Sequence, residues 1–365
     1  MKPINVFYDH QIFSLQRFGG ISRYFVGLIN EFQKMDSIRL EVGGIISDNH
    51  YLKEVESLKR ISFPIWFKKG RKQASFILNS SYDNLRINKF DIYHPTYFYP
   101  YLLRKSSPYV VTVYDMIREK FPQDSSKKSF KVDVKKRLVK NASRIIAISE
   151  NTKKDLIEIY SLPPERIDVI YLSTDLKGNF KKPTINNLPQ NYILFIGERA
   201  GYKNFSRFII AVGKIFSKFK DFYLVLGGGG NLSKSELEDI HDLGISNRVV
   251  QKNFSDQELI SAYRNASCFV FPSLYEGFGI PILEAFQCHC PVVLSNSSSF
   301  PEVAGEASIY FDPYSIESME ESILKVIEDS SLRRQLINLG LERLKNFSQK
   351  RVALDTLKVY QKVIS

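Results

Sequence analysis

The sequence of 365 residues contains no long hydrophobic run. None of its apolar stretches approaches the roughly 18 residues that a membrane-spanning helix needs. The first residues, Met1 to Val6, lead directly into a strand-like segment without the pattern of a signal peptide. With 44% hydrophobic and 25% charged residues the chain has the composition of a soluble globular protein, and we expect it to be cytoplasmic.

Cysteine is also scarce, with three residues in the whole chain. Cys268, Cys288 and Cys290 lie close together in apolar surroundings, which does not suit a disulfide framework. The segment Cys288-His289-Cys290 has a single histidine and lacks the ligand spacing of a zinc site. We therefore expect three buried thiols and no metal.

Two motif classes that bind common ligands are absent. The glycines Gly227–Gly230 follow a strand-like segment but lack the G-x-G-x-x-G spacing and the downstream acid of a dinucleotide site. Redox chemistry is therefore not indicated. The chain also carries no nucleic-acid-binding motif, and we expect no nucleic acid among its partners.

The net charge of +12 is concentrated in the N-terminal half. Residues 1–180 hold 30 lysines and arginines against 19 acidic residues, whereas residues 181–365 hold 21 against 20. Much of the excess lies in Lys53–Lys72 and Lys127–Lys140, where aromatic or apolar residues interleave with the bases. This mixture suits an anionic membrane surface, and solvated basic helices are the alternative.

Short apolar segments that alternate with helical patterns predict an α/β fold with parallel, doubly wound sheets. A chain of this length suits two domains, and the loose stretch Leu176–Asn191 marks their boundary. We expect domains over residues 1–180 and 181–345, followed by a last helix over 346–365. The strand-like segments lie at 5–8, 40–46, 91–94, 109–114, 144–148, 192–196, 222–226, 248–253, 267–271 and 291–295, and the segments after Val303 through Lys345 are expected to be helical.

The most informative stretch is the loop between the strand at 267–271 and the helix that follows it. Gly277 and Gly279 allow backbone amides to approach a ligand, and the helix N-terminus offers unpaired N–H groups to an anion. Glu276 and Glu284 frame this loop. Because carboxylates that face a phosphate would repel it, we expect them to accept hydrogen bonds from sugar and ribose hydroxyls. The alternative is a glycine-rich turn that caps an ordinary helix.

This stretch, Glu-Gly-Phe-Gly-x-Pro-x-Leu-Glu-Ala from Glu276 to Ala285, resembles the signature of the family 4 retaining glycosyltransferases. The resemblance implies a GT-B architecture, in which two Rossmann-like domains face each other across a cleft. It assigns the acceptor to the first domain and the nucleotide sugar to the second, and packs the last helix back on the first. Glu276 would hold the donor sugar and Glu284 the ribose, while the donor also contacts the loop residues Gly277, Phe278, Gly279 and Ile280.

A second loop, from Gly197 to Asn204, lies between a strand and a helix and is similar to the family's diphosphate-binding loop. Lys203 matches the lysine that binds the diphosphate. Arg199 matches a second cation only approximately, since Tyr202 stands where an arginine is common. Exposed loop charges are the alternative for both cations.

Two further segments match donor contacts of the family. Gly19 and Gly20 belong to a Gly-Gly-x-x-Arg loop that reaches the donor from the first domain. Asn253 and Phe254 lie where the family pairs its backbone with the base. Ser255–Glu258 has the pattern of a capping box, which is a purely structural explanation for this segment.

Four residues are expected on the acceptor side: His94, Tyr114, Asp115 and Glu150. The family commonly has a histidine that contacts the donor sugar at the position of Tyr114, so sugar contacts here are expected to differ. Each position also has a structural alternative. His94 could be a hydrogen-bonded structural histidine, Asp115 a cap for the next segment, and Ser149 a helix N-cap beside Glu150.

No Asp-x-Asp pair occurs, which removes the usual means of holding a divalent metal on a sugar nucleotide. Lys203, Arg199 and helix-terminal amides would then neutralise the leaving diphosphate. The resemblance implies retention of the anomeric configuration. Since we find no convincing nucleophile, we favour attack on the same face as the leaving group.

These features predict a metal-independent hexosyltransferase of surface glycan synthesis of the bacterial type. The donor is a nucleotide sugar, GDP-mannose by resemblance, which acts as a co-substrate, and no cofactor is required. The acceptor is a glycan or a polyprenyl-linked glycan. The alternatives are a sugar-nucleotide epimerase-like or phosphorylase-like enzyme of the same architecture and a non-catalytic sugar-nucleotide-binding protein.

Overall fold

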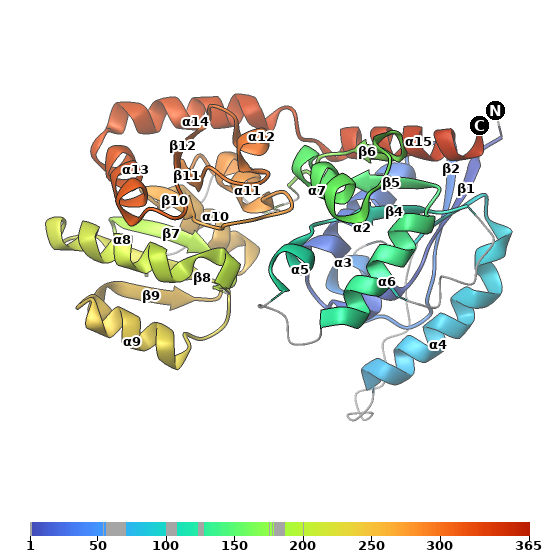
Figure 1. The fold of residues 1–365 in the computed structure, drawn as a ribbon, viewed down its shortest axis with the longest axis horizontal. Coiled ribbons are helices and arrows are strands. Elements are labelled where there is room, and N and C mark those ends of the chain that lie inside the picture. Colours follow the sequence, from blue (N-terminus) through green and yellow to red (C-terminus); the bar gives the residue numbers. More distant parts are fainter. Residues whose placement is uncertain are drawn as a thin grey trace. The chain divides into compact units, whose positions relative to one another are not determined.

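The structure is a computed structural model that describes residues 2–53, 55, 71–99, 108–122, 128–174, 176, 178, 187–199 and 201–365. The chain divides into two compact units (Figure 1). The first contains Met1–Glu119, Ser125–Asp175 and Ser348–Ser365, and the second contains Lys120–Asp124 and Leu176–Phe347. The boundary expected between residues 180 and 181 lies outside the described residues.

The first unit is built on parallel strands in two three-stranded sheets, with the orders β2-β1-β3 and β4-β5-β6. An isolated parallel bridge between Tyr93 and Tyr109 links the two sheets. The central strands of this first unit are apolar on both faces, because helices cover a parallel sheet from both sides. The strands are β1 (Ile4–Tyr8), β2 (Ile38–Val42), β3 (Ile92–His94), β4 (Val110–Val113), β5 (Arg144–Ala147) and β6 (Ile167–Val169).

The C-terminal helix α15 (Gln349–Ile364) belongs to this first unit. It contacts α2, β3 and β5 (Figure 1). Its Tyr360 hydroxyl lies 2.9 Å from that of Tyr8. The chain's last helix therefore completes the core of its first part. The other helices of this unit are α1 (Gln11–Leu15), α2 (Gly20–Phe32), α3 (His50–Lys53), α4 (Arg71–Arg86), α5 (Ile117–Lys120, of which Lys120 falls in the second unit), α6 (Lys128–Asn141) and α7 (Glu150–Tyr160).

Strand β2 starts and ends earlier than the expected segment at 40–46. Gly44 has a φ of +75°, a conformation that a strand does not accept. The Gly43 amide donates to the Tyr8 carbonyl at 2.6 Å, and the Gly44 amide donates to Asp83 Oδ1 at 2.7 Å. The two glycines therefore turn the chain away from the sheet directly after Val42.

The second unit contains a six-stranded parallel sheet with the order β12-β11-β10-β7-β8-β9. Strand order reverses between β7 and β10, which is the topological switch point where such sheets bind ligands. The prediction that residues after Val303 are all helical was wrong, because Ser308–Phe311 adds edge strand β12 beside β11. The other strands are β7 (Tyr192–Ile196), β8 (Tyr223–Gly227), β9 (Val249–Lys252), β10 (Cys268–Phe271) and β11 (Val292–Ser295).

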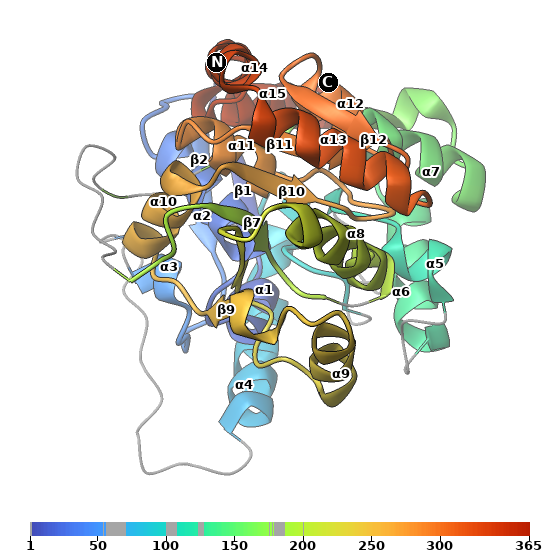
Figure 2. The ribbon, with the colours of Figure 1, turned by 90° about the vertical axis from the view of Figure 1, so that its left-hand side faces the viewer.

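Helices α8 (Phe205–Lys218) and α13 (Ile316–Glu328) lie side by side in Figure 1 and in Figure 2. They share a core with the strands, in which Phe195 stacks on Phe208 with ring centroids 5.7 Å apart. This core fixes the ends of β7 and β10. The other helices of the unit are α9 (Lys234–Asp242), α10 (Asp256–Asn265), α11 (Ile280–Gln287), α12 (Phe300–Ala304) and α14 (Ser330–Leu344).

Several local expectations are confirmed. Ser255 and Glu258 form the capping box of α10, and Ser149 Oγ accepts from the Thr152 amide at 2.9 Å as the N-cap of α7. The three cysteines are free and buried. Among the described residues, no helix combines the length and apolar character that crossing a membrane requires.

Candidate active site

The loops that follow β7 and β10 meet at the switch point of the second sheet. The Leu274 amide donates to the Tyr202 carbonyl at 2.8 Å and ties the two loops together. Lys203 ends a 3-10 turn in the first loop (Gly201–Lys203), and Glu276 lies in the second. Sheet topology therefore brings together two residues that belong to separate sequence motifs.

Lys203 and Glu276 form an ion pair with Nζ and Oε1 2.5 Å apart. Both side chains are largely buried, at 14% and 12% exposed. Ser273 Oγ donates to the same carboxylate oxygen at 2.7 Å, and the Glu276 amide donates to Ser298 Oγ at 2.9 Å. The ammonium also lies 5.3 Å from the ring centre of Phe271. A cation and a carboxylate are thus held in fixed positions at the switch point.

The backbone from Gly277 to Ile280 leads from this pair into α11. Gly279 is the N-cap residue with a φ of +103°, which favours glycine. Ser299 Oγ donates to the carbonyls of Glu276 and Phe278 at 3.1 and 2.9 Å and fixes the loop from behind. The N-terminus of α11 therefore opens at this loop. Its Ile280 amide can bind an anion, whereas Pro281 has no N–H and the Ile282 amide already donates to the Gly279 carbonyl at 2.9 Å.

Glu284 lies in the second turn of α11 and is buried. The Tyr263 hydroxyl donates to its Oε2 at 3.1 Å. Burial, followed by the charge of Glu284, raises the pKa of Tyr263 well above its ordinary value. The tyrosine therefore stays protonated and orients the carboxylate, which keeps acceptor capacity for further hydroxyl groups.

Arg199 is engaged with the glycine loop that follows β8. Its Nε lies 2.6 Å from Glu236 Oε1, and its terminal nitrogens donate at 3.1 to 3.3 Å to the four successive carbonyls of residues 228–231. Its side chain is 4% exposed. The guanidinium therefore fixes the shape of this loop, and its expected role toward the diphosphate stays a prediction.

Asn253 and Phe254 follow β9 beside the same glycine loop. The Gly228 amide donates to the Lys252 carbonyl at 3.1 Å. A side chain added at Gly227 would lie 2.9 Å from the Phe254 ring, so the ring packs directly on the strand end. Their expected contact with the base stays a prediction.

In the first unit, Gly19 and Gly20 form the start of α2. A Cβ at Gly19 would lie 2.3 Å from Gln16 Oε1, and the same oxygen accepts from the Ser22 amide at 3.3 Å. The Gln16 side chain thus folds over the glycine pair and stabilises the turn. Contact of this loop with a donor stays a prediction.

His94 is buried inside the first unit with both ring nitrogens hydrogen-bonded. Nδ1 lies 2.7 Å from the Tyr360 hydroxyl and Nε2 lies 2.9 Å from Thr112 Oγ1. Burial lowers the pKa of His94 to about 3. These contacts favour the structural alternative for His94 over an acceptor contact.

Tyr114 and Asp115 line a pocket of about 440 Å³ in the first unit. The Tyr114 hydroxyl is buried and has no hydrogen-bond partner among the described residues. Asp115 Oδ1 accepts from the Ile117 amide at 3.1 Å and so caps α5. Glu150 is exposed at the start of α7. Tyr114 and Asp115 therefore share a cavity that a ligand can enter, and the structure adds nothing on an acceptor role for Glu150.

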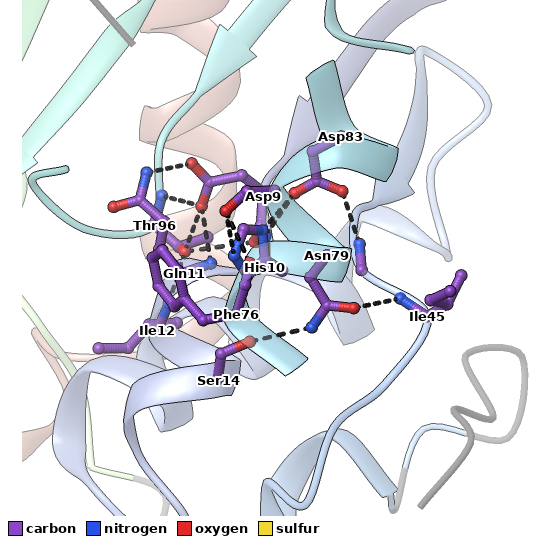
Figure 3. Close-up of polar contacts among 12 residues, drawn as sticks. Asp9, His10, Gln11, Ile12, Ser14, Ile45, Phe76, Asn79, Asp83 and Thr96 are labelled. Atoms are coloured by element: carbon purple, nitrogen blue, oxygen red, sulfur yellow. Dashed lines mark hydrogen bonds and ion pairs between the residues drawn. The ribbon is translucent and has the colours of Figure 1, made fainter. Parts of the chain in front are cut away.

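Sequence reasoning missed a buried polar network at the carboxyl end of β1 (Figure 3). Asp9 accepts from Gln11 Nε2 at 2.5 Å, from the Thr96 amide at 3.0 Å and from Thr96 Oγ1 at 2.6 Å. The Tyr93 hydroxyl also donates to Asp9. Burial raises the pKa of Asp9. An acid directly after a strand is the one signal that could have indicated this residue.

The same network attaches α4 to the loops beside it (Figure 3). Asp83 Oδ2 lies 2.7 Å from His10 Nδ1, and Asn79 Oδ1 accepts from the Ile45 amide at 2.9 Å. Asn79 Nδ2 donates to Ser14 Oγ at 3.1 Å. Helix α4 therefore turns polar side chains inward, and no sequence pattern indicated this.

Two family matches cover most of the chain. Residues 177–343 match the family described as Glycosyl transferases group 1, and residues 18–177 match Glycosyltransferase Family 4. The chain belongs to the family 4 glycosyltransferases. This confirms the family predicted from the Glu276–Ala285 stretch.

Relatives of this glycosyltransferase include mannosyltransferases. It is 29% identical to O-antigen chain mannosyltransferase B of Escherichia coli, over 76% of each chain. It is 27% identical to O-antigen chain mannosyltransferase RfbU of Salmonella typhimurium, over 59% of this chain and 60% of that protein. The matched part of the chain thus spans about three quarters of the length of mannosyltransferase B and about three fifths of the length of RfbU.

Solved glycosyltransferase structures show the same fold. Sucrose-phosphate synthase from Thermosynechococcus elongatus is similar with a TM-score of 0.76 and 18% identity, over 99% of both chains. Anabaena Alr3699/HepE in complex with UDP and glucose is similar with a TM-score of 0.71 and 19% identity, over 98% of both chains. The glycosyltransferase therefore has the predicted GT-B fold with Rossmann-like α/β units.

Proposed function

We propose that this glycosyltransferase transfers a hexose, with mannose favoured, from a nucleotide sugar to a glycan or polyprenyl-linked glycan in surface glycan synthesis. The observation that carries the proposal is the Lys203–Glu276 pair at the switch point, beside the N-terminus of α11 and the buried carboxylate of Glu284. The relatives named as O-antigen mannosyltransferases support the sugar and the product class.

In this proposal the donor spans the switch point of the second sheet. Lys203 and the Ile280 amide at the start of α11 bind the diphosphate, which places negative charge beside a cation and a helix N-terminus. Glu276 accepts from the donor sugar and Glu284 from the ribose. The fold similarity to a protein in complex with UDP and glucose supports a nucleotide-sugar site on this architecture.

The reaction is proposed to retain the anomeric configuration and to need no metal. The acceptor hydroxyl attacks the anomeric carbon from the side of the leaving group. The bond from this carbon to the diphosphate oxygen breaks, the new glycosidic bond forms, and the acceptor proton passes to the departing phosphate. Lys203 stabilises the negative charge that develops on the diphosphate, and fixed charges of this kind contribute several kcal/mol to such steps.

The first test is a thermal-shift screen of GDP-mannose and UDP-glucose in the presence of EDTA. A ligand that binds only the folded protein raises its midpoint. We expect one donor to raise the midpoint of the wild type and to lose most of this effect in Glu284→Ala. The matched control is Glu317→Ala, which removes an exposed carboxylate from the same unit. Equal shifts in wild type and Glu284→Ala, or no shift with either donor, would contradict the proposal.

A turnover assay separates the enzyme from its alternatives. A non-catalytic binding protein would give the thermal shift but never release nucleotide with any acceptor. An epimerase-like enzyme would change the donor sugar without an acceptor, and a phosphorylase-like enzyme would show the absorbance of pyridoxal phosphate. Nucleotide release that depends on a glycan acceptor supports the transferase alone.

We also propose that the first unit binds anionic membrane surfaces. Most of the basic segment Lys53–Lys72, and the side chains of residues 128–131, lie outside the described residues. Helix α4 is described, and it exposes Ile77, Leu78 and Leu85 at 64%, 50% and 80%. An outward apolar face on a strongly basic half suits insertion among anionic lipid headgroups.

Vesicle sedimentation tests this membrane proposal. We expect binding to vesicles of phosphatidylglycerol and phosphatidylcholine, no binding to phosphatidylcholine alone, and a clear loss in Leu85→Glu. The control is Leu237→Glu, which alters a 52% exposed leucine on α9 of the second unit. Equal sedimentation of both variants with the wild type would contradict a role for α4.

A further inference from the structure

The pocket that contains Tyr114 is lined by both charged and apolar residues. Its volume of about 440 Å³ is within the range of about 300–1,000 Å³ that small-molecule sites occupy. Four of the lining residues are charged: Asp115, Arg118, Glu119 and Lys135. The rest of the lining consists of the aromatic and aliphatic residues Leu15, Ile21, Tyr97, Phe98, Tyr99, Val132 and Val134.

Three of the four charges in this pocket are engaged within the protein. Lys135 Nζ lies 3.1 Å from Glu119 Oε1, and the Tyr160 hydroxyl donates to the same oxygen at 2.5 Å. Asp115 Oδ1 is turned to the Ile117 amide. Lys135 also donates to the Asp115 carbonyl at 2.6 Å. The pocket thus has two positive and two negative side chains, but both carboxylates already have partners within the protein.

Arg118 is the exception among these charges. It forms no hydrogen bond or ion pair with any residue in the described part of the chain. Burial raises the pKa of Tyr97, and the charge of Arg118 opposes this shift, which places the guanidinium near that phenol. Arg118 is partly exposed and has no anionic or carbonyl partner among the described residues, so its guanidinium is available to a ligand.

Tyr114 adds a second unsatisfied group. Its hydroxyl is buried and has no partner in the described ranges, and burial raises its pKa well above the ordinary value. The phenol therefore stays protonated and can donate one hydrogen bond. Buried polar groups without a partner are rare, and a ligand atom is one of the ways in which they are satisfied.

We propose that this pocket binds a lipid phosphate, with Arg118 paired to the phosphate, the Tyr114 hydroxyl donating to it, and the apolar walls holding the first part of the chain. This assignment rests on the proposed function, because it identifies the acceptor's lipid-phosphate part. Bidentate pairing of a guanidinium with phosphate gives strong, oriented binding. An apolar lining beside a single available cation suits a ligand with an apolar body and one anionic end.

Binding of three probes by isothermal titration calorimetry tests the proposal without any donor. The probes are citronellyl phosphate below its micelle concentration, citronellol, and inorganic phosphate. We expect the full-length wild type to bind citronellyl phosphate at least tenfold tighter than either of the others, since a charge-assisted pair contributes about that factor or more. Equal affinity for citronellyl phosphate and citronellol would overturn the anion site. Equal affinity for citronellyl phosphate and inorganic phosphate would overturn the lipid assignment.

Variants assign the effect to the pocket. Arg118→Gln should reduce the affinity for citronellyl phosphate to that for citronellol, and Tyr114→Phe should reduce it several-fold. The control is Arg137→Gln, which removes an exposed arginine from α6, the helix that carries Lys135. Wild-type affinity in Arg118→Gln would contradict the proposal. The donor thermal shift is measured separately, so that failure of the lipid-phosphate site and failure of the proposed transferase are distinguishable.

Discussion

Lys203 Nζ lies 2.5 Å from Glu276 Oε1, although the two residues belong to loops that follow different strands. The pair is largely buried and carries a further hydrogen bond from Ser273. Breaking a buried pair leaves one charge without compensation, which is much more costly than losing an exposed one. The same two groups are therefore expected to affect both stability and the proposed chemistry.

Lys203→Gln should lower the kcat/KM of the transferase by about 10²–10³-fold, because a positioned charge on the leaving group is lost. The measurement is the rate of nucleotide release with a saturating acceptor. Lys214→Gln is the control, since Lys214 lies 2.9 Å from Glu317 in an exposed pair of the same unit. An activity loss of similar size in both variants would point to a general effect of lysine removal and contradict the assignment.

Arg199→Lys should lower the free energy of unfolding by about 1–3 kcal/mol. The guanidinium donates to Glu236 and to four carbonyls at once, and the single ammonium of a lysine cannot reproduce this fork. Glu236→Gln should lower stability in the same direction, as measured by urea denaturation.

Donor affinity then separates a structural role of Arg199 in the glycine loop from the predicted contact with the diphosphate. We expect Arg199→Lys to weaken donor binding in the thermal-shift assay and Glu236→Gln to leave it close to the wild-type value. Unchanged donor binding in both variants would mean that Arg199 acts only on the glycine loop and would exclude the predicted diphosphate contact.

Much of the second unit could be predicted because its central strands are short, continuous apolar runs. The strand at Tyr192–Ile196 has the predicted bounds, and the loops that carry Lys203 and Glu276 lie where the predicted strands end. The edge strand Ser308–Phe311 was missed since its two central residues are partly exposed and its sequence, SIYF, lacks a clear period. Loop positions thus follow from strand ends, whereas edge strands depend on the neighbouring strand.

Side-chain partners could not be predicted, since they come from distant parts of the chain. The partner of His94 is Tyr360, 266 positions further along, and the partner of Arg199 is Glu236. The polar inner face of α4 has the same origin, because Asp83 binds the turn after β2 and His10 after β1. A single sequence carries the residue types but not these pairings.

Gly279→Ala should destabilise the protein more than Gly244→Ala does. Both glycines have positive φ, +103° and +66°, where a non-glycine residue costs about 1–2 kcal/mol. A Cβ at Gly279 would also lie 2.9 Å from Ile282 Cδ1 and 3.1 Å from Phe300 Cε1, whereas one at Gly244 meets no atom within 4 Å. Chemical denaturation of both variants measures the difference, and donor binding should weaken in Gly279→Ala only. Equal losses of stability in the two variants would show that the loop around Gly279 accommodates the added methyl group without strain.

The stability of the first unit should decrease on acidification because of His94. Burial lowers its pKa to about 3 in the folded protein, from an ordinary value of 6.5. Below pH 6.5 the unfolded chain takes up a proton that the folded protein does not bind. The stabilisation is therefore complete above pH 6.5 and is lost as the pH falls toward 3, with about 2 kcal/mol lost by pH 5.

The variant His94→Gln keeps a donor and an acceptor but cannot titrate in this range. We therefore expect the difference in unfolding free energy between pH 7 and pH 5 to be about 2 kcal/mol smaller in His94→Gln than in the wild type, as measured by urea denaturation. His241→Gln is the control, because the His241 side chain is 83% exposed and its removal should leave this difference unchanged. The same pH dependence in His94→Gln and wild type would mean that His94 takes up a proton in the folded protein, in contradiction to the lowering of its pKa by burial.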